Sequence, residues 1–109
     1  MSFSGNFTRV TLGADPEVDG ANAIFVEGRT DNTADPPDAI HVIMPHGGKP
    51  LTATVATPTL IDWEVKFPEE ETPFAEGDDV FVVGVATRPE PHDPFVWEGS
   101  FKLESRDFP

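Results

Sequence analysis

The chain has 109 residues, the size of one domain, so we expect a single domain spanning residues 1–109. It contains no cysteine, which excludes disulfide frameworks, thiolate metal sites and cysteine nucleophiles. Its formal net charge of −13 would repel nucleic-acid phosphates and anionic membrane surfaces, which argues against direct binding to either.

The first half of the chain consists of short apolar segments in which large and polar residues alternate. This two-residue period is that of a strand with one face in a core, and prolines and glycines separate the segments. We expect Pro45 to end the third strand, and the Gly47-Gly48 pair supplies the positive φ angles of a tight hairpin turn to the fourth. The strands predicted in this half cover residues 7–12, 23–29, 40–44 and 51–55.

The second half adds three predicted strands. In the segment 60–67, Trp63, Val65 and Phe67 alternate with charged residues and are expected to point inward. The strand 79–87 is apolar on both faces, which indicates a central position in its sheet. The last predicted strand is 95–103, and no segment shows the 3.6-residue apolar stripe of a helix.

Seven strands in about a hundred residues predict an all-β protein with an antiparallel immunoglobulin-like or fibronectin III-like sandwich. In this arrangement Gly28 lets strand and loop approach closely, Trp63 fills the middle of the sandwich, and a turn at 76–78 leads into the sixth strand. The order of these features over roughly residues 22–87 resembles the bacterial immunoglobulin-like modules that occur in tandem in surface adhesins. The segments that carry the resemblance are 24–28, 40–42, 51–55, 62–65, 74–78 and 80–86.

No set of residues with the pattern of a catalytic site is visible. The four serines lie near the ends of the chain or within a strand, without the sharp turn that exposes a nucleophile. His92 beside Asp93 is the one pair that could serve as a metal ligand set or an acid–base pair, and no ligand spacing supports it. We therefore expect a protein that is not an enzyme.

Two kinds of ligand site are nonetheless suggested by side-chain type. The loop carboxylates of Asp15, Glu17 and Asp19 could supply oxygen ligands to calcium, although their spacing departs from that of a dedicated calcium loop. Phe3, Phe25 and Phe81 are out of phase with the predicted core and could stack on sugar rings. A calcium- or carbohydrate-binding module is therefore the alternative hypothesis, and no other cofactor is expected.

The main hypothesis is a non-enzymatic module that binds a protein partner, or a second copy of itself, through an apolar sheet face and loops. An apolar surface on the outer side of the sixth strand would be a typical protein interface. The apolar stretches are too short to cross a bilayer, so we expect no membrane insertion. No signal peptide is recognisable, and the sequence does not indicate the cellular compartment. The residues predicted to contact the partner are Phe81, Val83, Val85, Phe25 and His92.

Overall fold

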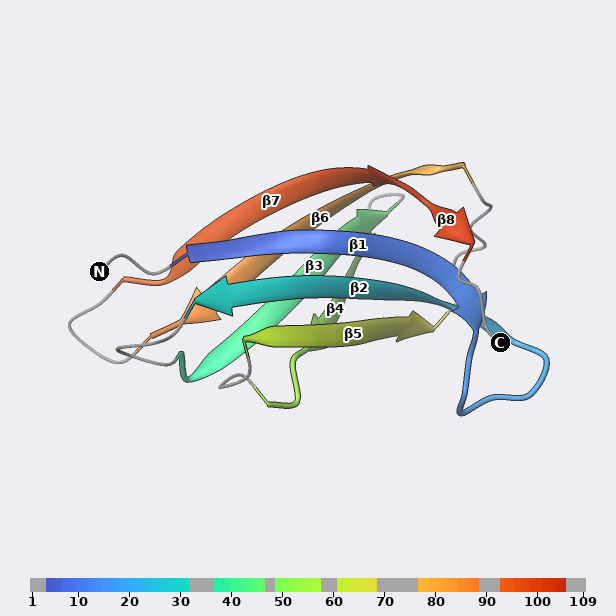
Figure 1. Ribbon diagram of the computed structural model, residues 1–109, viewed down its shortest axis with the longest axis horizontal. Helices are drawn as coiled ribbons and strands as arrows, with labels where there is room; N and C mark the ends of the chain where they lie inside the picture. Colours follow the sequence, from blue (N-terminus) through green and yellow to red (C-terminus); the bar gives the residue numbers. More distant parts are fainter. Residues whose placement is uncertain are drawn as a thin grey trace.

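The computed structural model is an all-β sandwich of two four-stranded sheets packed face to face (Figure 1). It describes residues 4–31, 37–46, 49–57, 61–68, 77–88 and 93–105. One sheet has the strand order β5-β2-β1-β8 and the other the order β4-β3-β6-β7. The strands are β1 (Ser4–Ala14), β2 (Asn22–Asp31), β3 (Ala39–His46), β4 (Lys49–Thr54), β5 (Asp62–Pro68), β6 (Asp79–Thr87), β7 (Phe95–Lys102) and β8 (Glu104–Ser105).

The described residues form eight strands, so the prediction of seven is wrong. After β7 the chain passes to the other sheet at Leu103, which is 1% exposed and whose N–H donates to the carbonyl of Asp78. The two residues that follow pair parallel with Thr11 and Leu12 of β1. A strand of two residues is too short to show any periodicity, which is why the sequence pattern missed it.

The predicted hairpin of the third and fourth strands is confirmed, because β3 and β4 pair antiparallel. Its tip at 47–48 lies outside the described residues. Pro45 does not end β3 as expected, since the ladder continues through Pro45 opposite Pro50 to the next pair. Proline has no N–H, but two prolines can face each other at a position where an antiparallel ladder makes no hydrogen bond. On the other side of β3, the pairing with β6 ends at Ile43, so within the described part of the chain Pro45 has no partner strand there to which it would have to donate.

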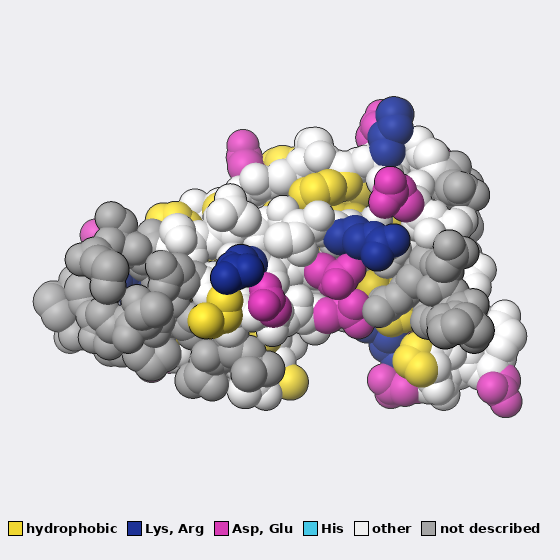
Figure 2. All heavy atoms as spheres, viewed as in Figure 1, with side chains coloured by type: hydrophobic (Ala, Val, Ile, Leu, Met, Phe, Trp, Pro, Cys, Tyr) yellow, Lys and Arg dark blue, Asp and Glu magenta, His cyan; other side chains and the backbone are white. Residues whose placement is uncertain are grey.

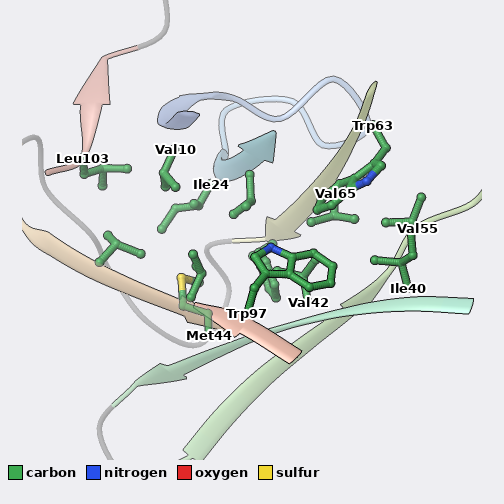
Figure 3. Packing of buried hydrophobic residues seen from close by; sticks show 14 of the residues in the cluster. Val10, Ile24, Ile40, Val42, Met44, Val55, Trp63, Val65, Trp97 and Leu103 are labelled. Atoms are coloured by element: carbon green, nitrogen blue, oxygen red, sulfur yellow. The ribbon is translucent and has the colours of Figure 1, made fainter. Parts of the chain in front are cut away.

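The core lies between the two sheets and matches the predicted inward faces (Figure 3). Trp63, Val65 and Phe67 of β5 are all at most 6% exposed, and β6 contributes Val80 and Val82 from its predicted central position. Burying each large apolar side chain contributes about 1.5–3 kcal/mol. The remaining buried members of this cluster are Val10, Ile24, Val26, Ile40, Val42, Met44, Val55, Ala86, Trp97 and Leu103.

Two tryptophans from opposite sheets meet in the core, and each lies against a glycine. The ring centroids of Trp63 and Trp97 are 6.3 Å apart, and Phe7 contacts both rings. A Cβ on Gly28 would lie 2.3 Å from the Trp63 ring, and one on Gly84 would lie 2.3 Å from the Trp97 ring. The missing side chains therefore make the space that the indoles occupy. At Gly28 the group that approaches is the Trp63 ring of the neighbouring strand β5, whereas a loop was expected there.

Candidate functional site

The outer face of the sheet β4-β3-β6-β7 carries a continuous group of apolar side chains, here called the apolar strip. Register places them side by side: Val85 pairs with Val96 of β7, and Val83 pairs with Ile43 of β3. Phe81 is 41% exposed and Val96 is 60% exposed, whereas the other members are half-buried. The apolar strip consists of Ile43, Phe81, Val83, Val85 and Val96.

Polar residues border the apolar strip on neighbouring strands. His41 and Thr54 continue the row of Val85 across β3 and β4, and the His41 Nδ1 lies 3.1 Å from the Thr54 Oγ1. On β7, Glu98 and Ser100 lie opposite Val83 and Phe81. An apolar centre with a polar border is the usual composition of a protein interface.

Three of the predicted contact residues lie together as expected. Phe81, Val83 and Val85 share the outer face of β6, while the sequence analysis missed Ile43 and Val96. The missed residues carry the same signal, because each is an apolar residue out of phase with the buried residues of its own strand. His92 lies outside the described residues.

Phe25 does not belong to this surface, and the prediction that it is exposed is wrong. It lies in the other sheet, on the outer face of β2, between Thr11 of β1 and Lys66 of β5. Phe25 is only 5% exposed and Thr11 is fully buried, so this part of the outer face is covered. Alternation predicts the face on which a side chain lies, but it does not show whether that face is covered.

The carboxylates predicted to bind calcium are arranged around a lysine. Lys66 Nζ lies 2.8 Å from Asp15 Oδ1 and 2.8 Å from Glu17 Oε1, and the Glu17 N–H also donates to Asp15 Oδ1. Hydrogen bonding to Lys66 lowers the pKa of Asp15, and hydrogen bonding to Asp15 and Glu17 raises the pKa of Lys66. The lysine ammonium thus supplies the positive charge that these carboxylates require.

Asp19 does not join this group. In the part of the chain that the structure describes, no three His, Asp or Glu side chains are arranged to hold a metal ion. Asp15 nevertheless has the most buried side chain of the group, at 1% exposure, and Lys66 is 21% exposed. The arrangement therefore ties the β1–β2 connection to β5, across β2, instead of presenting an open coordination site.

Other basic side chains are also next to carboxylates. Arg9 lies 3.9 Å from Glu104, and Arg29 lies 3.8 Å from Asp62. Figure 2 shows the same mixture, with Lys and Arg side chains beside Asp and Glu on this face of the molecule. Such exposed pairs are worth little in stability, but they leave no continuous basic surface on the face shown.

Comparisons with protein-family models, with curated proteins and with solved structures found no match. Among the residues described, the structure has no helix with the length and apolar character needed to cross a membrane.

Proposed function

We propose that this protein is a non-enzymatic interaction module whose binding face is the apolar strip. The observation that carries the proposal is an apolar face that continues across three neighbouring strands, with Phe81 and Val96 its most exposed members. Contiguous exposed apolar surface is costly in water, and on a monomer it commonly marks a protein contact. A sheet face with an apolar centre and a polar border suits another protein surface better than a small ligand, which usually binds in a concave pocket.

The fold supports this proposal in a second way. The fourth strand, β4, pairs with β3. In a constant-type immunoglobulin domain the fourth strand belongs instead to the sheet of the first, second and fifth strands. We infer from this order a fibronectin III-like arrangement within the immunoglobulin-like group. The resemblance to bacterial adhesin modules suggests the same class of role, in which the sandwich acts as a structural or binding unit.

The proposal can be tested by making the apolar strip polar. The variant Phe81→Ser/Val96→Ser changes two side chains that point outward, so we expect it to fold, as checked by circular dichroism. The control is Val18→Ser, which alters an apolar residue in the β1–β2 connection that is about as exposed as Phe81 and lies far from the strip in sequence. Self-association is measured by light scattering over a dilution series, and retained proteins are identified after capture on the immobilised chain.

We expect the strip variant to lose association that the wild type and Val18→Ser retain. The proposal would be wrong if all three proteins were monomeric and captured the same proteins in the same amounts. It would also be wrong if Val18→Ser abolished association and the strip variant did not.

A further inference from the structure

The apolar strip reaches an edge of its sheet at β7, and this edge differs from the others. Exposed strand edges offer unpaired backbone groups, and proteins usually block them with prolines, charges, bulges or short strands. The opposite edge of this sheet is β4, which is six residues long and contains Pro50. In contrast, β7 has eight residues without proline, and among the described residues it pairs only with β6.

The edges of the other sheet carry the usual obstacles. The strand β5 alternates charged outward residues, Asp62, Glu64 and Lys66, and it ends at Pro68. At the other side β8 is two residues long, and the part of β1 that extends past it has an irregular register between Phe7 and Arg9. Figure 1 shows β7 as the outermost strand along one border of the molecule. The strand β7 also carries outward charges, Glu98 and Lys102, but they have opposite signs and lie four residues apart, so two antiparallel copies could pair them. With no proline in the strand, this is the edge best suited to accept another copy.

We propose that a second copy of this chain pairs antiparallel with residues 98–102 of β7, about a two-fold axis at Ser100. This inference goes beyond the proposed function, because the contact is the strand edge beside the apolar strip and not the strip itself. A two-fold axis perpendicular to the sheet keeps both outer faces on one side, so the two apolar strips would lie on the same side of the dimer, with the polar residues of the two β7 strands between them. This symmetry limits the possible registers. Side chains alternate along each strand, so facing side chains point to the same side of the sheet only if one residue faces its own copy at the axis.

Charge selects the register among the few that remain. With the axis at Ser100, Glu98 of each copy faces Lys102 of the other, which gives two opposite-charge pairs. With the axis at Glu98 the two glutamates would face each other, and with the axis at Gly99 both charged residues would face uncharged ones. Lys102 already lies 3.1 Å from Asp79 across the β6–β7 pair, so in the dimer it would lie between two carboxylates.

The size of the contact and the charge of the chain set the expected strength. One strand pair buries less than a standard specific interface, so we expect a weak dimer with a Kd on the order of 10 μM to 1 mM. Two chains of charge −13 repel each other, and salt screens that repulsion over about 8 Å at physiological ionic strength. Added salt should therefore strengthen the dimer.

Sedimentation equilibrium of two charge reversals tests the register. In Glu98→Lys the facing residues would both be lysines, and in Lys102→Glu they would both be glutamates, so each variant should weaken the dimer by about tenfold or more. When the two variants are mixed, each chain faces the opposite charge on the other, and heterodimers should form with nearly wild-type affinity. Thermal melts confirm that each variant is folded.

The outcomes separate this inference from the proposed function. Recovery of association in the mixture supports pairing about Ser100. A wild-type dimer that neither reversal weakens overturns it, and so does a wild type that stays monomeric at millimolar concentration. In the last case, the proposed function still stands if capture of another protein depends on Phe81 and Val96, and it fails as well if no such dependence is found.

Discussion

The substitution Gly28→Ala tests whether the indole of Trp63 is held by the missing side chain opposite it. A Cβ at this position would lie 2.3 to 2.8 Å from three ring atoms of Trp63. Because ordinary contacts are about 3.4 Å or longer, the ring must move by roughly 1 Å. The movement strains its contacts with Phe7 and Trp97 and the hydrogen bond that Trp63 Nε1 donates to Thr30 Oγ1 over 3.2 Å.

The expected cost follows from these parts. Overpacking costs about 1–3 kcal/mol, and a weakened hydrogen bond adds about 0.5–1.5 kcal/mol. Alanine is better than glycine in a strand by roughly 0.5–1 kcal/mol, which offsets part of the loss. We therefore expect Gly28→Ala to lower the free energy of unfolding by about 1.5–3 kcal/mol, measured by urea denaturation.

A double-mutant cycle identifies the cause. In a Trp63→Leu background the ring is absent, so Gly28→Ala should be neutral or slightly stabilising, and the coupling between the two sites should be about 2–3 kcal/mol. The reasoning would be refuted if Gly28→Ala cost less than about 0.5 kcal/mol in the wild type, or if it cost the same amount in both backgrounds.

Two further substitutions probe buried polar groups. Thr30→Val removes the acceptor of the Trp63 indole and should cost about 1–3 kcal/mol in urea denaturation. The Thr11 hydroxyl is buried and has no hydrogen-bond partner among the described residues, so Thr11→Val should be neutral or stabilising, and equal costs for the two substitutions would contradict this reasoning. Because the pKa of Asp15 is lowered in the folded state, its stabilisation is present above the unfolded pKa and is lost as the pH falls through the folded value. Asp15→Asn should therefore lower the melting temperature near neutral pH. It should also make the melting temperature decrease less on acidification from about pH 5 to pH 2, and the same decrease in the variant and the wild type would contradict this role of the bond to Lys66.

Much of this fold is predictable from the sequence because a sheet face is a local property of the chain. The alternation around Trp63 and Val65 correctly indicates their inward direction, and the apolar outer face of β6 correctly indicates its central position. The pairing of β3 with β4 follows from a short connection between two strands, which is again local information.

The missed features depend on contacts between residues distant in sequence. Asp15 is held by Lys66, which is 51 residues away, so its own loop gives no sign that its carboxylate is already engaged. Phe25 is buried by its surroundings on the outer face, and no pattern within β2 reveals them. The apolar strip was only partly predicted. Ile43 and Val96 carry the same out-of-phase signal as Val83 and Val85, but only strand pairing shows that these residues lie side by side.

The short strand β8 bears on how the sandwich responds to mechanical tension. The strand β1 begins at one end of the long axis, which is 44 Å in extent, and β8 lies towards the other end (Figure 1). Because β8 runs parallel to β1, opposite forces applied at Ser4 and Ser105 would slide the two strands along each other and would not peel them apart. Hydrogen bonds across the strands would then be loaded together, so the sandwich should resist stretching along this axis more strongly than stretching across it.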